Sequence, residues 1–172
     1  MEPCESNQPL DAPLPACDAR IETLYNYWRG IRPGRPHLPG RQHLDPTAIP
    51  KFLPTIWLCD VHRDPWRFKY RLVGTELVRM VGYDATGQWL DETIAKVKGG
   101  DNFEDLAFVA EGRGLSYRRG FAPLLMPEKS HLASERIVLP LARNGSDIDI
   151  LLGFSIYHNA PALSRPRRTI PA

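Results

Sequence analysis

The stretch RFKYRLVGTELVRMVGYDATGQWLDE, residues 67–92, changes its hydrophobic period partway along. Phe68, Tyr70 and Leu72 alternate with polar residues, which predicts a strand with one buried face and one face in water. Beyond the next glycine the apolar spacing becomes helical, and Gly82 is placed to end that short helix in a left-handed conformation. The stretch therefore predicts one strand followed by a chain of short helices.

Further strands are expected on both sides of this stretch. Residues 55–61 are rich in β-forming side chains, and a turn at Asp64 and Pro65 joins them to the strand above as an antiparallel hairpin. Three later segments predict a meander of strands, residues 115–126, 130–142 and 147–158. Five strands in one antiparallel sheet, with short helices gathered across one face, make an α+β fold.

An amphipathic helix is expected near the N-terminus, where Asp18 can cap it and Gly30 can end it. Its apolar face contains Ile21, Leu24, Tyr25 and Trp28. This face either packs on the core of its own domain or covers a partner subunit. In the second case Leu24, Tyr25 and Trp28 are the candidate interface residues.

Two more helices are expected between the hairpin and the meander. Residues 88–98 place apolar side chains along one helical face. Residues 101–110 start with Asp101 and Glu104, a pair that resembles a capping box, and carry another apolar stripe. The middle of the domain is thus predicted to be a series of small helices.

Length and composition are those of one soluble globular domain. The chain has 172 residues, of which 42% are hydrophobic and 24% charged, enough for a self-sufficient core. Residues 18–160 are expected to form the domain. The proline-rich segments 1–17 and 161–172 are expected to be flexible tails, and the second of them is basic.

Charge and cysteine content exclude several partners. A formal net charge of +2 indicates no nucleic-acid partner, and an N-terminus with acidic residues and prolines does not resemble a signal peptide. No apolar run approaches the roughly 20 residues that cross a bilayer, so no membrane association is expected. Cys4, Cys17 and Cys59 are odd in number and irregularly spaced, which argues against disulfides and metal knuckles. A cytoplasmic location is expected.

The predicted order of elements matches the PAS fold, and several motifs resemble a PAS-like family of alphaproteobacterial proteins. These motifs, in order, are LYNYWRG, LDPTAIPKFLPTIWLCDV, RFKYRLVGTELVRMVGYDATGQWLDE, ERIVLPLARNG and DILLGFSIYH. The resemblance covers roughly residues 20–158. It implies a small cavity between the sheet and the crossing helices, with sensing or dimerisation transmitted through the outer sheet face and the flanking helices. Such membership predicts architecture better than activity.

Signatures of the cofactors that some PAS domains bind are not found. Residues 74–114 contain no cysteine of the kind that flavin-binding relatives use, and residues 101–112 contain no histidine for a haem iron. Cys59 lies in a predicted strand and is expected to be a buried free thiol. His37 and His43 are not spaced as metal ligands, so no metal site is expected and the cofactor is unknown.

Catalytic patterns are also missing from the sequence. No serine lies in a G-x-S-x-G elbow, and no glycine-rich phosphate loop opens a helix. Asp91 and Glu92 are adjacent on a predicted helix and therefore point in different directions, which weakens any paired acid–base role. The chain is not expected to be an enzyme.

The candidate pocket residues are those expected to converge between helices and sheet: Phe68, Tyr70, Leu72, Phe103, Leu106, Ala110, Tyr117 and Arg118. Tyr70 and Tyr117 can offer hydroxyls to a small-molecule ligand, and Arg118 can pair with an acidic one. The alternative is that these side chains simply fill the core.

The function expected from these observations is that of a non-catalytic sensor or adaptor in signal transduction. It would act through a small ligand, through self-association, or through a separate signalling protein. Two alternatives stay open: a pure protein-interaction module with a filled interior, and a small α+β enzyme with a polar cleft.

Overall fold

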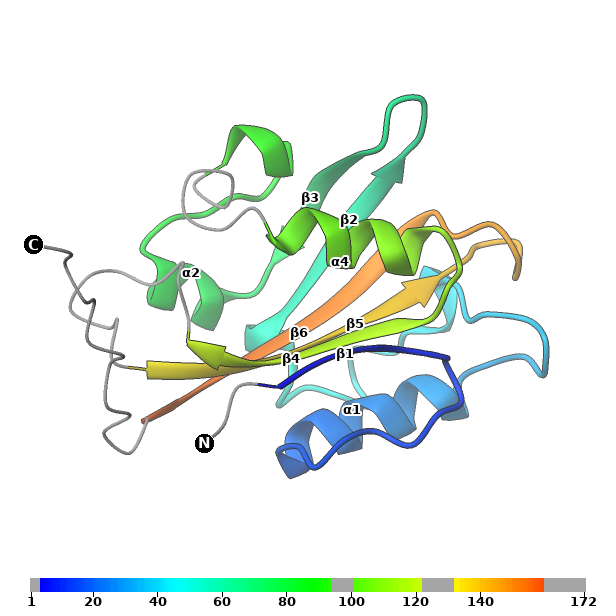
Figure 1. Cartoon of the computed structure of the whole chain (residues 1–172), viewed down its shortest axis with the longest axis horizontal. Helices are drawn as coiled ribbons and strands as arrows, with labels where there is room; N and C mark the ends of the chain where they lie inside the picture. Colours follow the sequence, from blue (N-terminus) through cyan, green and yellow to red (C-terminus); the bar gives the residue numbers. More distant parts are fainter. Residues whose placement is uncertain (1–3, 94–100, 122–131, 160–172) are drawn as a thin grey trace, which may run out of the picture.

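The computed structural model describes residues 4–93, 101–121 and 132–159, whose strands form a single antiparallel sheet (Figure 1). Within these residues the sheet has six strands in the order β1-β4-β5-β6-β2-β3. They are β1 (Cys4–Gln8), β2 (Ile56–His62), β3 (Arg67–Val73), β4 (Leu115–Phe121), β5 (Leu132–Leu141) and β6 (Ile150–Asn159). The same residues form the helices α1 (Ala19–Gly30), α2 (Thr75–Val81) and α4 (Asp101–Ala110), and the 3-10 turns η1 (Arg41–His43), η2 (Leu53–Thr55) and η3 (Leu90–Glu92).

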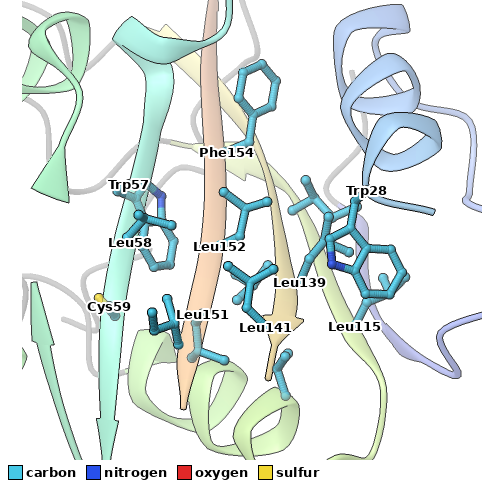
Figure 2. Close-up of a cluster of buried hydrophobic side chains, with 14 of the residues drawn as sticks. Trp28, Trp57, Leu58, Cys59, Leu115, Leu139, Leu141, Leu151, Leu152 and Phe154 are labelled. Carbon is cyan, nitrogen blue, oxygen red and sulfur yellow. The ribbon is translucent and has the colours of Figure 1, made fainter. Parts of the chain in front are cut away.

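Both groups of strands expected from the sequence are confirmed. β2 and β3 pair as an antiparallel hairpin, and β4, β5 and β6 pair in sequence order as a meander. β2 also pairs with β6, which joins the hairpin and the meander into one sheet. Apolar side chains lie opposite one another across the central strands, as with Ile137 and Phe154 or Leu139 and Leu152. These rows form the middle of the core, and Figure 2 shows several of them.

The expectation of five strands is wrong, because the N-terminal segment adds a sixth. β1 pairs antiparallel with β4, from Cys4 opposite Arg119 to Gln8 opposite Leu115. Residues 4–8 therefore belong to the sheet, although their sequence CESNQ has no apolar alternation and predicts a tail. The physical reason is the outer edge of β4, whose backbone donors and acceptors would otherwise be unpaired.

α1 follows directly on Asp18, whose carboxylate Oδ1 accepts a hydrogen bond from the Arg20 backbone N–H at 2.8 Å. Its apolar face lies against the sheet. The indole Nε1 of Trp28 donates a hydrogen bond of 3.0 Å to the carbonyl oxygen of Pro140, and Figure 2 shows this indole on the α1 side of the core. A residue on the helix is thus bonded directly to β5.

The assignment of Leu24, Tyr25 and Trp28 as interface residues is corrected by their burial. Their exposed fractions are 0%, 4% and 0%, and all three belong to the main core cluster of the chain. A side chain that is already covered by its own domain has no surface left for a partner. The apolar face of α1 therefore packs on the core of its own domain, which is the first of the two alternatives expected from the sequence.

α4 and α1 lie on opposite faces of the sheet. α4 packs on β4, β5 and β6, and Figure 1 shows it in front of these strands. The other face receives α1. The short α2 ends at Gly82, which has a φ of 78° and confirms the predicted left-handed end. The expected helix over 88–98 appears as η3 alone up to Thr93. Its remainder, the part of the expected meander over residues 122–131 and the basic tail 161–172 lie outside the described residues.

Gly153 of β6 lies directly under the indole of Trp57. A Cβ atom at position 153 would lie 1.9 Å from Cε2 of that ring. The ring is also held from its edge, because Trp57 Nε1 donates a hydrogen bond of 3.0 Å to Ser155 Oγ. The indole therefore cannot move aside without losing this buried hydrogen bond.

Gly153→Ala should consequently lower the free energy of unfolding by about 1–3 kcal/mol, as overpacking of a tight core does. Urea denaturation monitored by tryptophan fluorescence measures the change. The matched control is Gly30→Ala at the end of α1, where a Cβ would meet nothing within 4 Å. Wild-type stability in both variants would contradict the tight contact between Trp57 and Gly153.

Candidate functional site

The alternation of side chains along each strand decides which predicted pocket residues lie together. Phe68 and Tyr70 of β3 point to the face that α4 covers, where Tyr70 meets the Trp57 ring with centroids 6.1 Å apart. Arg118 of β4 points to the same face, because its Nε lies 2.8 Å from Asp105 Oδ2 in α4. Two strands and one helix thus contribute side chains to a common region, called here the α4 face.

α4 contributes Leu106 and Ala110, which are buried against the sheet with exposed fractions of 2% and 3%. Phe103 lies at the rim of the α4 face. Its ring meets that of Phe68 edge-on with centroids 5.5 Å apart, yet 41% of the residue is exposed. The predicted residues Phe68, Tyr70, Leu106, Ala110 and Arg118 therefore lie on this one face, with Phe103 at its edge, although β5, β6 and β2 separate Arg118 on β4 from Phe68 and Tyr70 on β3.

Tyr117 and Leu72 do not belong to this group, which corrects two of the predicted pocket positions. Tyr117 precedes Arg118 in β4, and consecutive strand residues point to opposite faces, so the two cannot line one pocket. Leu72 is displaced by a β-bulge: it pairs with Leu58, whereas Tyr70 pairs with the next residue, Cys59. Leu72 is turned off the α4 face and is 41% exposed.

An ion cluster forms the polar centre of the α4 face. Asp105 of α4 is 4% exposed, and its Oδ2 contacts the guanidinium groups of both Arg118 and Arg136. The side chains of Arg118 and Arg136 are 25% and 14% exposed. One carboxylate in α4 thus binds two arginines from neighbouring strands. Such a cluster holds the helix in a defined position on the sheet.

Two tyrosines lie close to this cluster. Burial raises the pKa of the Tyr70 hydroxyl well above its usual value, and burial raises that of Tyr157 to about 12. Burial also lowers the pKa of the Arg136 guanidinium, although the nearby Asp105 opposes this shift. Both hydroxyls are therefore neutral at physiological pH and can donate or accept hydrogen bonds beside a charged arginine.

Asp105 and Arg136 were not predicted as site residues, although the sequence contains a signal for each. Asp105 is a charged residue on the otherwise apolar stripe of its helix, one turn from Val109. Arg136 and its neighbour Glu135 interrupt the apolar strand LASERIVLPLA. Charged residues at positions that the hydrophobic period assigns to the interior indicate a buried polar network.

A second polar group lies on the other face of the same two strands. Glu135 of β5 is 2% exposed, and its Oε2 accepts hydrogen bonds from the Asp18 backbone N–H at 2.9 Å and from the Tyr117 hydroxyl at 3.0 Å. Nε2 of His158 lies 3.3 Å from Glu135 Oε1. Burial, together with the bond to Glu135, raises the pKa of Tyr117. This group joins the start of α1 to the sheet.

The two polar groups are adjacent along the backbone. In β5, Glu135 binds the start of α1 and the next residue, Arg136, binds α4. In β4, Tyr117 binds Glu135 and the next residue, Arg118, binds α4. Neighbouring residues of β4 and β5 therefore connect the helices on both sides of the sheet.

A hollow of about 510 Å³ lies elsewhere, between residues 11–17 and α1. Its lining includes Asp11, Glu22, Tyr25 and Arg29, and none of the predicted pocket residues lines it. Cys59, on the α4 face, is fully buried and free, which confirms the predicted buried free thiol, and burial raises its pKa. Among residues 4–93, 101–121 and 132–159, no three His, Cys, Asp or Glu side chains are grouped so that they could hold a metal ion.

Comparison with known families agrees with this architecture. A family model described as a PAS domain matches residues 18–155. The chain therefore belongs to the PAS domain family, whose members are generally sensory modules without catalysis of their own. No curated protein and no solved structure matches the chain. In the described part of the chain, every helix is too short or too polar to span a bilayer.

Removing the carboxylate of Asp105 should be strongly destabilising. Asp105→Asn leaves two arginines on the α4 face without their shared carboxylate, so the free energy of unfolding should fall by about 3–5 kcal/mol. The control is Asp60→Asn, which breaks the more exposed ion pair between Asp60 and Arg71 and should cost less than about 1 kcal/mol. Chemical denaturation measures both variants. Equal losses would show that the buried cluster is no stronger than a surface pair.

Asp18 should contribute pH-dependent stability. The hydrogen bond from the Arg20 side chain holds the pKa of Asp18 at about 2. Because this value lies below that of the unfolded chain, the stabilisation is complete above about pH 4 and is lost as the pH falls toward about 2. Asp18→Asn keeps a capping oxygen but no charge. The difference in unfolding free energy between wild type and this variant should shrink over that interval, and a constant difference would contradict the assignment.

Proposed function

We propose that this PAS domain is a non-catalytic sensory or adaptor module that transmits a change at the α4 face to the start of α1. The observation that carries the proposal is the adjacency of the two polar groups. Arg118 and Arg136 bind α4, and their immediate neighbours Tyr117 and Glu135 hold the other face. A displacement of α4 acts on β5 next to Glu135, which binds Asp18, and on β4 next to Tyr117, which binds Glu135.

The ion cluster on the α4 face supports a role beyond stability. Desolvation of charged groups costs free energy, and well-packed apolar residues often give equal or greater stability in their place. Asp105 is nearly fully buried and shared between two arginines, so its geometry depends on the position of α4. A polar or acidic small molecule that competes for these arginines would therefore shift the helix.

The surroundings of the cluster favour such a ligand. Tyr70 and Tyr157 add hydroxyl groups, Leu106 follows Asp105 in α4 and adds apolar surface, and Phe68 lies on the same face of the sheet. Small-molecule sites are usually lined by apolar side chains with a small number of polar groups among them. The predicted pocket residues Phe68, Tyr70, Phe103, Leu106, Ala110 and Arg118 remain the proposed contacts, with Asp105, Arg136 and Tyr157 added.

Hydrogen exchange of the backbone amides tests the transmission. Arg118→Gln removes one bond between α4 and the sheet, so exchange should accelerate in α4 and also in the first turn of α1, residues 19–22. The matched control is Arg71→Gln, which removes an ion pair to Asp60 on the hairpin. The β2–β3 amides serve as the internal reference for global unfolding. Acceleration confined to α4 would contradict transmission across the sheet.

A pure interaction module with a filled interior is the second candidate. The tight burial of Phe68, Leu106 and Ala110, at 1%, 2% and 3% exposed, favours it. Native mass spectrometry of the protein purified from its own cells separates the two candidates. A retained molecule that is lost in Arg136→Met would support the sensor, and a ligand-free protein with a retained partner would support the interaction module.

Output is expected through association, either of two copies or with a separate signalling protein. The free thiols Cys4, Cys17 and Cys59 fit a reducing compartment such as the cytoplasm.

A small α+β enzyme is the remaining alternative. Substrate turnover by the purified chain, lost in an α4-face variant, would replace the proposal by that alternative.

A further inference from the structure

β1 is attached to the sheet mainly through its backbone. It pairs with the edge strand β4 along its whole length. Cys4, Ser6 and Gln8 are only partly buried and Asn7 is exposed, so the side chains add little apolar burial. A strand of this kind opens at lower free-energy cost than the core strands, because few packed contacts must be broken.

The edge that β1 covers belongs to the core of the domain. Leu115 and Tyr117 of β4 are fully buried, and an uncovered β4 would present a row of free backbone donors and acceptors. At the end of β1, the residue that precedes β4 leaves room for the β1 backbone. Gly114 has a φ of 153°, and a Cβ at that position would lie 2.0 Å from the carbonyl oxygen of Gln8. A covering strand therefore protects this edge of β4, and the backbone of β1 approaches it closely at Gly114.

The connector between β1 and α1 reverses direction. A turn forms where the Ala12 N–H donates to the Pro9 carbonyl oxygen at 3.0 Å, and the chain then returns to Asp18. The turn is held by Asp11, which pairs with Arg32 at 3.0 Å and with Arg35 at 3.1 Å. The hollow of about 510 Å³ separates much of this connector from α1. Polar contacts hold this turn, while Leu10 and Leu14 of the connector also pack against the core.

The connector sequence favours an extended form. Residues 9–17 contain Pro9, Pro13 and Pro15, and proline-rich segments adopt stiff, extended conformations. Opening the turn would let these nine residues span about 30 Å. Such a length is sufficient to carry β1 from its own β4 to a neighbouring molecule.

We propose that β1 is exchanged between two copies of this chain, so that the β1 of each copy pairs with the β4 of the other. The occupant is a second copy because only the same segment reproduces the register from Cys4 to Gln8 and the close approach at Gly114. The exchanged β1–β4 contacts equal the intramolecular ones, and the dimer forms when the turn opens and the connector is released from its own contacts to Tyr25 and the core. The inference rests on the proposed function for its purpose, since exchange next to Tyr117 and Asp18 supplies the association that output requires.

Disulfide trapping between two different variants tests the exchange. The donor copy carries Cys17→Ser and keeps Cys4. The acceptor copy carries Cys4→Ser, Cys17→Ser and Arg119→Cys, which places a thiol opposite the position of Cys4 in the β1–β4 register. Neither copy can form this disulfide within itself, because Cys59 is fully buried. A disulfide joins the two only when β1 of the donor lies on β4 of the acceptor.

After co-incubation and mild oxidation, we expect the mixed disulfide to exceed that of a control acceptor by about tenfold or more. The control carries Arg119→Ser and Arg143→Cys, so that both acceptors lose the bond from Arg119 to the Ala16 carbonyl oxygen; the Arg143 side chain is 78% exposed and lies outside the β1–β4 register. Asp11→Asn in both copies should raise the yield further, because it releases the turn. Circular dichroism verifies that each variant is folded.

Light scattering of the unmodified chain provides a second measurement. Self-association that is lost when residues 1–8 are deleted supports the exchange. Cross-linking no greater than the control, or a monomer across micromolar concentrations, overturns it, and so does a β1 that pairs only with another protein. A chain that couples α4 to α1 in hydrogen exchange but forms no mixed disulfide keeps the proposed function and loses this inference alone.

Discussion

Neighbouring residues of a β-strand point to opposite faces of its sheet, and the organisation of this domain depends on how β5 uses that constraint. Glu135 receives the capping segment of α1, while Arg136 receives the carboxylate of Asp105 from α4. One peptide unit thus separates the attachments of two helices that never touch the same face. The proposed coupling of α4 to α1 depends on this adjacency, because both attachments share one short stretch of the β5 backbone.

This arrangement places two polar groups inside an apolar core, where desolvation of charged side chains lowers stability. Asp105 and Glu135 are 4% and 2% exposed, and each is stabilised only by bonds that come from several elements at once. Removal of one bond leaves the others strained or unpaired, so each group responds as a unit. Well-packed apolar residues at such positions often give equal or greater stability, and the proposed signalling role of the network is argued from this comparison.

Local patterns in the chain were sufficient for the hairpin, the meander and the end of α2, because turn residues and hydrophobic period act over a few positions. They were insufficient for the pocket. Tyr117 and Arg118 were both expected there, although strand geometry allows only one of them. Leu72 points away from the α4 face because of a β-bulge, and the position of that bulge depends on strand pairing with Leu58 and Cys59. The partners of Arg118 are distant in the chain, and no local rule connects Asp105 with Arg136.

The amino-acid sequence by itself determined the order of strands and helices, the α+β class and the family resemblance, since each follows from short-range preferences repeated along the chain. Only the tertiary structure decided that α1 packs on its own sheet, that CESNQ becomes a sixth strand and that two arginines share one carboxylate. The reason is the same in each case. Burial of Trp28, pairing of β1 with β4 and charge pairing at Asp105 all need a partner surface that exists only after distant segments have come together.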